Sequence, residues 1–211
     1  NASEITQDTA MDFSQLLDLV TTEFPKTRFR FSTSNPQDMS LDVIYTMAKH
    51  ENICKYIHLP VQSGNTRVLD LMNRTYSREW YMERVEAIYR IMPDCAISSD
   101  IIAGFCTETE EEHQETLSLI EYVKYDFGFM FAYSERPGTA AEKKMVDDIP
   151  LEVKKRRLAE VILLQQKYSL YNTEKFVGKT VEVLIEGSSK KSEAHWKGRN
   201  SQNATVVFPK G

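Results

Sequence analysis

The sequence predicts an α/β fold in which helices alternate with strands, followed by a small all-β module. Two observations support this. Apolar residues at helical spacing alternate, up to about residue 171, with short apolar runs that end in Gly, Pro or Ser. After residue 175 the apolar residues alternate as in β-strands, and a Gly/Ser/Lys-rich turn at 187–191 separates them. Alternation of strands and helices is typical of a parallel sheet or barrel, in which side chains at the strand ends share one face.

Polar residues that can cap a helix precede three of the predicted helices, at Ser40, Ser77 and Thr109. At Thr109 the following glutamates complete a capping box. The predicted elements of the α/β part are, in order, helix 11–24, strand 28–33, helix 40–50, strand 55–61, helix 66–72, helix 77–92, strand 96–104, helix 109–125 and strand 127–133.

A long helix is predicted from Pro150 to about residue 171, with Asp148 as its possible cap. Strands are predicted beyond it at 180–186 and 203–208, with 193–199 as a candidate third strand. The predicted division is 1–149 for the α/β part, 150–174 for the connecting helix and 175–211 for the all-β module. Four parallel strands cannot close a barrel and three strands bury little core, so we expect both parts to be incomplete.

Composition excludes several classes of protein. The 211 residues are 41% hydrophobic and 27% charged, which is ordinary for a globular protein. No apolar run approaches the roughly 20 residues that cross a bilayer, and no signal peptide is visible, so we expect a cytoplasmic protein without membrane contact. Its three cysteines (Cys54, Cys95 and Cys106) are widely spaced, which argues against a disulfide framework or a self-contained metal site.

Charge is distributed unevenly along the chain. Residues 175–211 hold seven Lys/Arg and three Glu, a balance of +4, whereas the whole chain carries −5. A basic end on an acidic body suggests contact with a polyanion such as RNA, although a solvated surface would look the same. In this module Trp196 and Phe208 could stack on bases, but Phe208 suits a core position equally well. The predicted phosphate contacts are Lys190, Lys191, Lys197 and Arg199.

Polar residues follow the predicted strands where chemistry would occur in a barrel. They are Ser32 and Ser34, Gln62 and Ser63, Asp100 and Gly104, and Tyr133 and Ser134. Asp100 interrupts an apolar strand, which is costly unless the carboxylate is paired or functional. Gly104 would let a ligand approach the backbone or simply begin a turn. Arg74 could clamp a carboxylate or phosphate, or be an ordinary surface arginine.

Two charged runs have simpler interpretations. The glutamates at 110–112 favour a solvated helix face near a positive dipole end over a catalytic cluster. The basic run from Lys154 to Arg157 could touch RNA, but a solvated helix face is the safer interpretation.

Taken together, the motifs of this chain resemble the methylthiotransferase branch of the radical S-adenosylmethionine enzymes, in its tRNA-modifying, MiaB-type form. The resemblance covers essentially the whole chain. It is carried by His58-Leu-Pro-Val-Gln-Ser-Gly64, Met72-Asn-Arg-Thr-Tyr76, Ser99-Asp-Ile-Ile-Ala-Gly-Phe105 with Glu108, Tyr133-Ser-Glu-Arg-Pro-Gly-Thr139, Lys155-Arg-Arg-Leu158 with Gln165 and Gln166, and Gly198-Arg-Asn with Val206-Val-Phe208.

This resemblance implies replacement of C2–H by a methylthio group in the modified adenosine at tRNA position 37. It implies S-adenosylmethionine as cofactor, two [4Fe–4S] clusters in the full-length parent, a tRNA anticodon stem-loop as substrate, and an electron donor of the flavodoxin or ferredoxin type. It also implies a six-stranded, TIM-like radical-SAM barrel, of which four strands would be present here, followed by a truncated TRAM module.

The cysteines depart from the family pattern. A radical cluster needs three thiolates in a CxxxCxxC loop and the auxiliary cluster needs three more, and neither set is present. We therefore expect the cluster ligands to lie upstream of residue 1, this chain to hold no metal, and the isolated fragment to be inactive.

The resemblance also assigns roles to individual residues. Ile102 would be an apolar contact to the cofactor's adenine, and Tyr133 and Arg136 would face the mouth where RNA enters. The residues expected on the cofactor side are Ser32, Ser34, Gln62, Ser63, Arg74, Asp100, Ile102 and Gly104. Three alternatives stay open: an RNA-binding piece without catalysis, a methylthiotransferase for another tRNA adenosine modification, and a phosphate-binding TIM-barrel enzyme. The last is disfavoured because no Gly-rich loop opens a helix.

Overall fold

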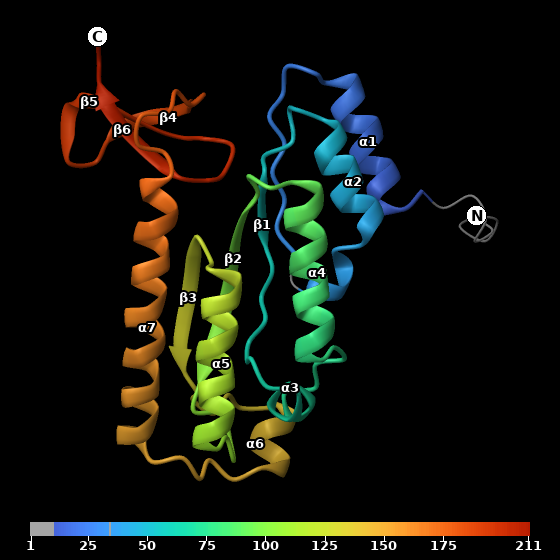
Figure 1. Cartoon of the computed structure of the whole chain (residues 1–211), viewed down its shortest axis with the longest axis vertical. Coiled ribbons are helices and arrows are strands. Elements are labelled where there is room, and N and C mark those ends of the chain that lie inside the picture. Colours follow the sequence, from blue (N-terminus) through green and yellow to red (C-terminus); the bar gives the residue numbers. More distant parts are fainter. Residues whose placement is uncertain (1–10, 34) are drawn as a thin grey trace.

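The computed structural model describes residues 11–33 and 35–211, which form an α/β body and a separate antiparallel sheet (Figure 1). Three parallel strands in the order β1-β2-β3 form the sheet of the body. The elements of the body are α1 (Phe13–Glu23), a 3-10 turn (Pro36–Asp38), α2 (Leu41–Lys49), β1 (Tyr56–His58), α3 (Thr66–Leu71), α4 (Arg78–Ile91), β2 (Ala96–Ala103), α5 (Glu110–Val123), β3 (Phe127–Ala132), α6 (Ala140–Lys144) and α7 (Leu151–Glu174).

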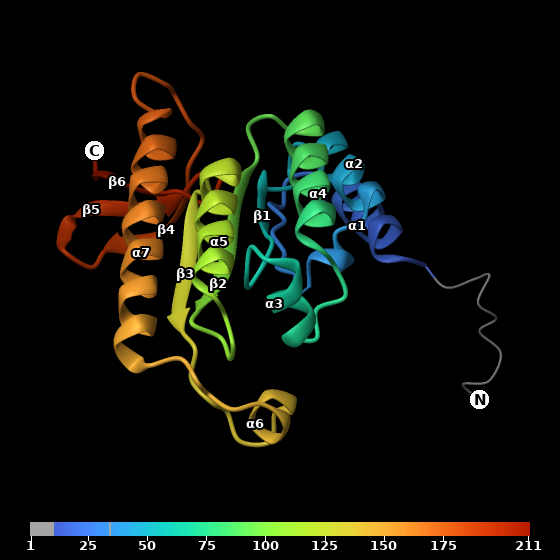
Figure 2. The same ribbon diagram turned by 60° about the horizontal axis from the view of Figure 1, so that its bottom comes forward.

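Side chains of β2 alternate between two different faces of the sheet. Ile97 and Ile101 are completely buried in the core, which they share with residues of α2, α4, α5 and α7. Asp100 and Ile102 point to the other face and are partly exposed. Phe129 of β3, paired with Asp100, is exposed on the same face. Figures 1 and 2 both show α5 and α7 side by side along β3. The helices therefore cover one face of the sheet and leave polar and aromatic side chains on the other.

Two of the predicted strands differ from the structure: one is reduced to a single bridge, and the other is shorter than expected. The prediction of a strand at 28–33 is wrong: only Phe29 pairs, in a single parallel bridge with Ile53. An alternating sequence pattern defines two faces of a strand but does not supply a neighbouring strand for its backbone. Among the described residues of this segment, only Phe29 has its backbone N–H and C=O in hydrogen bonds with another segment. The strand predicted at 55–61 is regular only at Tyr56–His58, because Pro60 cannot donate to the ladder.

The helix starts agree well with the sequence. Ser40, Ser77 and Thr109 each accept a backbone N–H of the helix that they cap, and Thr109 forms the predicted capping box. The long helix α7 begins at Leu151 with Pro150 as its N-cap, so the prediction of Asp148 as the cap is wrong. Asp148 instead accepts the backbone N–H of Thr107 at 2.7 Å. None of the described helices is both long enough and apolar enough to span a membrane.

The antiparallel sheet has the order β4-β5-β6, formed by Leu184–Ser189, Ser192–Arg199 and Thr205–Pro209. The candidate strand at 193–199 is confirmed, whereas the strand predicted at 180–186 begins later, at Leu184. This sheet contacts the body at the segments that lead into β1 and β2. There the Lys55 N–H donates to Ser201 at 2.9 Å and Gln202 donates to the carbonyl of Asp94 at 3.3 Å. It therefore lies at the N-terminal ends of the parallel strands, opposite to α6 (Figure 1).

Candidate functional site

A cavity of about 420 Å³ lies where the parallel strands end, between β2, β3, α3 and α6. It brings together six of the residues that the sequence singled out: Gln62, Arg74, Asp100, Ile102, Tyr133 and Arg136. The other lining residues are Leu71, Met72, Asn73, Phe105, Phe131, Ala132, Ser134, Thr139, Ala140 and Ala141. The cavity is thus largely apolar and carries a few charged groups, which is the usual composition of a small-molecule site.

The backbone of Gln62 is held in an unusual conformation at the edge of this cavity. Its φ is +71°, in the left-handed region that residues other than glycine seldom adopt. Its N–H donates to the carbonyl of Asp100 at 2.9 Å, and its own carbonyl accepts the N–H of Ile102 at 2.8 Å. Since both bonds tie Gln62 to β2, the sheet maintains the strained backbone, as is common at functional sites.

Three buried tyrosines brace the strand exit that leads to Gln62. The hydroxyl of Tyr76 donates to the carbonyls of Pro60 and Val61, each at 3.2 Å. The hydroxyl of Tyr81 donates to the carbonyl of Leu59 at 2.8 Å and accepts from Tyr125 at 2.9 Å. Burial raises the pKa of Tyr76 to about 12, so this brace stays protonated at neutral pH.

A polar chain runs along the open face of the sheet to Asp100. The hydroxyl of Ser98 lies 2.6 Å from Tyr56 Oη and 2.8 Å from His58 Nδ1, and the other ring nitrogen of His58 lies 3.5 Å from the carboxylate of Asp100. Asp100 is thus neither an isolated carboxylate nor one satisfied only by backbone donors. Sequence reasoning missed His58, although strand alternation places it on the same face as Asp100.

Arg74 contributes a buried donor without an acceptor. Its Nε is inaccessible to solvent and, among the described residues, has no hydrogen-bond partner. Its backbone N–H donates to the carbonyl of Leu69 at 2.9 Å, which fixes the residue just after α3. A buried guanidinium nitrogen without an acceptor is costly, so Arg74 is suited to an oxygen-bearing anionic ligand.

Tyr133 forms a wall of the cavity between an aromatic ring and a lysine. Its ring packs edge-on against Phe105, with centroids 4.8 Å apart, and Lys154 Nζ lies 5.1 Å from the ring centroid. Lys154 also forms an ion pair with Asp147 at 2.5 Å, so its position is fixed. Burial, aided by the Cys106 thiol, raises the pKa of Tyr133 to about 12, so Tyr133 is neutral at physiological pH.

Three of the predicted cofactor residues that the structure describes, Ser32, Ser63 and Gly104, do not line the cavity. Ser63 is fully buried beside Thr116 of α5, and its hydroxyl accepts the N–H of Asn65 at 3.3 Å. Gly104 has φ +75° and packs against Lys154, whose Cγ would lie 2.5 Å from an added Cβ. The group that approaches the backbone of Gly104 closely is therefore the side chain of Lys154, and not a ligand in this cavity. Ser32 is exposed away from the cavity, and Ser34 lies outside the described residues.

The residues predicted to bind RNA fall into two separate groups. Tyr133 and Arg136 lie at the cavity, whereas Lys190, Lys191, Lys197 and Arg199 belong to the antiparallel sheet or its first turn, at the other end of the body. Lys190 and Lys191 are exposed in the β4–β5 turn. The side chain of Arg199 already donates to Asn203 at 2.8 Å and lies 3.4 Å from Glu186.

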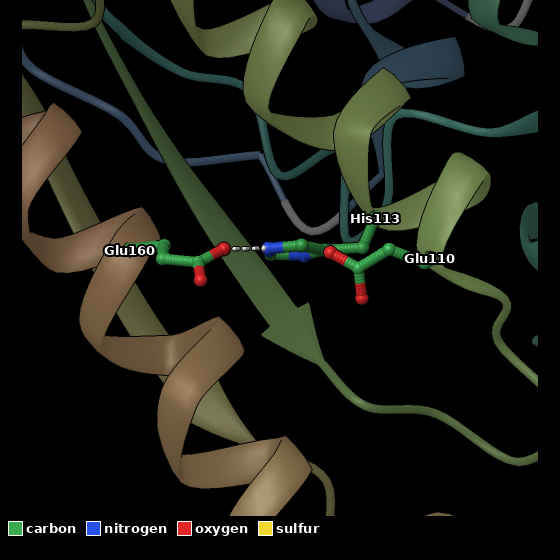
Figure 3. Close-up of side chains that lie close together, drawn as sticks. All are labelled: Glu110, His113 and Glu160. Atoms are coloured by element: carbon green, nitrogen blue, oxygen red, sulfur yellow. Dashed lines mark hydrogen bonds and ion pairs between the residues drawn. The ribbon is translucent and has the colours of Figure 1, made fainter.

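An acidic cluster between α5 and α7 has ligand-like geometry (Figure 3). The ring of His113 is fully buried and its Nε2 lies 2.8 Å from Glu160. Arg156 pairs with Glu160 at 2.6 Å and with Glu110 at 2.5 Å. The hydrogen bond that Arg156 donates to Glu110 lowers the pKa of Glu110 to about 2. Because Arg156 already neutralises both carboxylates, we assign the cluster to the packing of α5 against α7.

The basic run at the start of α7 is only partly solvated. Lys154 and Arg157 are 4% exposed, whereas Lys155 and Arg156 face solvent. Arg157 donates to the carboxylate and to the carbonyl of Glu108, both at 2.9 Å. Two of the four basic residues therefore serve to hold α7 on the body. The prediction of a uniformly solvated face is wrong for these two.

Comparisons with known proteins agree with this architecture. A family model described as the Radical SAM superfamily matches residues 6–120, and one described as the TRAM domain matches residues 174–211. The chain resembles coproporphyrinogen III oxidase (HemN) from Escherichia coli, described as a radical SAM enzyme, with a TM-score of 0.53 at 21% identity. That likeness covers 79% of this chain and 45% of the other, and it shows a shared fold.

Curated relatives match along the whole chain. It is 61% identical over 210 residues to the tRNA-2-methylthio-N(6)-dimethylallyladenosine synthase of Christiangramia forsetii, which covers 100% of this chain and 44% of that protein. It is 53% identical over 199 residues to the protein of the same name from Bacteroides fragilis, covering 94% and 44% respectively. The chain thus spans less than half the length of these relatives.

Proposed function

The chain belongs to the radical SAM superfamily, and we propose that it forms part of a tRNA-2-methylthio-N(6)-dimethylallyladenosine synthase. The observation that carries the proposal is 61% identity to a protein of that name over the full extent of this chain. The TRAM match at residues 174–211 supports an RNA substrate, for which we propose a tRNA anticodon stem-loop. An electron donor of the flavodoxin or ferredoxin type and a cytoplasmic location follow from the same proposal.

The cavity at the strand ends suits S-adenosylmethionine. Arg74 lines the cavity and would turn its guanidinium group to the carboxylate of the cofactor, and Asp100 offers a carboxylate to its amino group or ribose hydroxyls. Ile102 and Phe131 supply apolar surface for the adenine. When bound, one molecule of the cofactor would supply the methyl group, and a second molecule, cleaved reductively, would supply the 5′-deoxyadenosyl radical. The protein residues hold and orient it, while the apolar wall limits the access of water.

The iron–sulfur clusters do not fit the residues of this chain. Its three cysteines are all buried, and they lie in separate places: Cys54 follows the bridge residue Ile53, Cys95 precedes β2, and Cys106 lies in a small core with Val68 and Phe105. Burial raises the pKa of Cys95 to about 12, which disfavours the thiolate that a cluster needs. Cluster ligands would have to come from other residues.

The proposal is tested with the full coding sequence that contains this chain, expressed in a bacterial host deleted for its own synthase. We expect 2-methylthio-N6-dimethylallyladenosine to reappear in nucleoside digests of the host tRNA, measured by mass spectrometry. If the tRNA retains only the unthiolated nucleoside, although the protein is produced with its clusters loaded, the proposal is wrong.

A further inference from the structure

A second cavity, of about 430 Å³, lies between the body and the antiparallel sheet. Its walls come from the loops before β2 and β3, from the C-terminal end of α7, and from Val181 and Gln202. It lies at the N-terminal ends of the parallel strands, so it is distinct from the cavity that contains Arg74 and Asp100. None of the sequence motifs pointed to it.

Three lysines, Lys124, Lys175 and Lys179, line this second cavity. Among the described residues, none of the three has a carboxylate within ion-pair distance. The ammonium group of Lys175 lies 4.6 Å from the ring centroid of Tyr171, and that of Lys124 lies 5.7 Å from the same centroid. One exposed aromatic ring thus lies close to two ammonium groups, neither of which forms an ion pair with an acid among the described residues.

The backbone of Lys124 is fixed in an unfavourable conformation. It ends α5 with φ 56° and ψ 57°, the left-handed region where glycine is usual. Its carbonyl accepts the side-chain N–H of Asn172 on α7 at 2.7 Å. The hydrogen bond from Asn172 holds Lys124 at the rim of the cavity. Glycine at this position would relieve the backbone strain, so the presence of lysine indicates a role for its side chain in the cavity.

Two acids also line the cavity, but they do not cancel the lysines. The carboxylate of Asp126 is largely buried and accepts the backbone N–H of Ile97 at 2.9 Å. Asp94 is exposed at the rim, where its carbonyl contacts Gln202. Three ammonium groups thus share the cavity with one exposed and one internally bonded carboxylate. A cleft in which positive groups outnumber negative groups concentrates negatively charged ligands.

We propose that this junction cavity is a phosphate-binding subsite for RNA, with Lys124, Lys175 and Lys179 as its phosphate contacts. The inference rests on the proposed function, which provides an RNA substrate. It extends the RNA surface beyond the segment matched as TRAM, because Lys175 and Lys179 lie in that segment whereas Lys124 belongs to the body. RNA bound there would bridge the two parts of the protein.

The test measures binding of a fluorescein-labelled RNA hairpin, with N6-dimethylallyladenosine in its loop, to this chain over a range of KCl concentrations. The variant is Lys124→Met, Lys175→Met and Lys179→Met combined. Its matched control combines Lys49→Met, Lys155→Met and Lys167→Met, which removes the same charge elsewhere on the body. Each phosphate contact adds roughly 0.7 to 0.9 to the slope of log affinity against log salt, so the junction variant should lower the slope by about 2.

We expect about a hundredfold loss of affinity at 0.1 M KCl for the junction variant and less than about twofold for the control. Asp94→Asn, which removes a rim charge without touching the core, should strengthen binding. Thermal unfolding followed by circular dichroism checks that each variant is folded; if the junction variant is not, the salt slopes of the three single variants decide. A junction slope equal to that of the control overturns the inference, as does a chain that does not bind the hairpin.

Two further measurements separate this inference from the proposed function. Loss of binding in Lys190→Met with Lys191→Met, but not in the junction variant, would place the RNA on the antiparallel sheet alone and leave the function standing. Absence of methylthiolated tRNA with the full protein would remove the function, whatever the hairpin affinity.

Discussion

At the scale of single residues, Asp126 shows what burial does to a carboxylate. Burial raises its pKa from 3.8 to about 6, although the N–H of Ile97 and the charge of Lys175 both favour the ionised form. The folded protein therefore holds this proton more tightly than the unfolded chain does. Between about pH 4 and pH 6 the contribution of Asp126 to stability falls as pH rises, and the loss is complete above that window.

We predict that Asp126→Asn is more stable than the wild type at pH 7, by about 2 kcal/mol, because asparagine keeps an acceptor for Ile97 without a charge. The gain should disappear near pH 4, where Asp126 is protonated in the wild type. Urea unfolding of both proteins at the two pH values measures the difference. Equal differences at pH 4 and pH 7 would contradict this assignment.

Gly64 is required for a different reason, the approach of α5. A Cβ at Gly64 would lie 2.5 Å from Thr116 Cα and 2.8 Å from the carbonyl oxygen of Glu115, both backbone atoms that cannot yield cheaply. We predict that Gly64→Ala costs about 2 to 3 kcal/mol of unfolding free energy.

The control for this prediction is Gly138→Ala, where φ is +86° but nothing lies within 4 Å of the added Cβ, so only about 1 kcal/mol of backbone strain is expected. Chemical denaturation of the two variants compares the costs. A Gly64 variant no less stable than the Gly138 variant would mean that α5 is free to move away.

At the scale of elements, α7 is held on the body by ion pairs that its sequence conceals. Arg157 and Glu108 form a buried pair, with side chains 5% and 1% exposed. Burial raises the pKa of Glu108, but the N–H of Gly104 and the guanidinium of Arg157 oppose that effect. Removing one partner would leave an uncompensated charge in the interior, which costs more than the pair itself contributes.

We predict that Arg157→Met destabilises the chain by about 3 kcal/mol or more. The exposed neighbour Arg156 is the control, because Arg156→Met breaks only solvent-accessible pairs and should cost much less than Arg157→Met. The double variant Arg157→Met with Glu108→Leu should recover part of the loss. Guanidinium denaturation measures all three variants, and equal costs at positions 156 and 157 would exclude the buried pair as the anchor of α7.

The sequence predicted the elements that depend on local chemistry and missed those that depend on contacts. The caps at Ser40, Ser77 and Thr109 depend on local chemistry, and the structure confirms them. The polar strand exit at Gln62 is local as well, and Gln62 lines the cavity at the strand ends, while its role there stays a prediction. The strand predicted at 28–33 and the inward-facing Arg157 depend on partners distant in the sequence. The five-residue helix α6 is too short to give a periodic signal. The hydrogen bonds from the buried tyrosines to the strand exit before Gln62 could not be predicted, because a buried tyrosine is indistinguishable in sequence from any other core aromatic residue.

At the scale of the whole molecule, the cavity at the strand ends and the junction cavity lie at opposite ends of the body. Figure 1 shows the elements beside them, with α3 and α6 at one end and the antiparallel sheet at the other. The helix that runs between the ends, α7, has 24 residues, which corresponds to about 36 Å. One nucleotide cannot reach both ends, so the target base and the phosphates at the junction must belong to distant parts of one RNA. The antiparallel sheet and junction cavity would then supply affinity, and the cavity at the strand ends would supply chemistry.

We propose that Gln62, Arg74 and Asp100 together form one wall that holds the cofactor and the substrate. The most direct test changes all three to alanine in the full protein and measures 2-methylthio-N6-dimethylallyladenosine in host tRNA, with Arg90→Ala, on the surface of α4, as the control. We predict at least about a tenfold loss of product in the triple variant and none in the control. Product formation at the wild-type level by a stable triple variant would contradict the account.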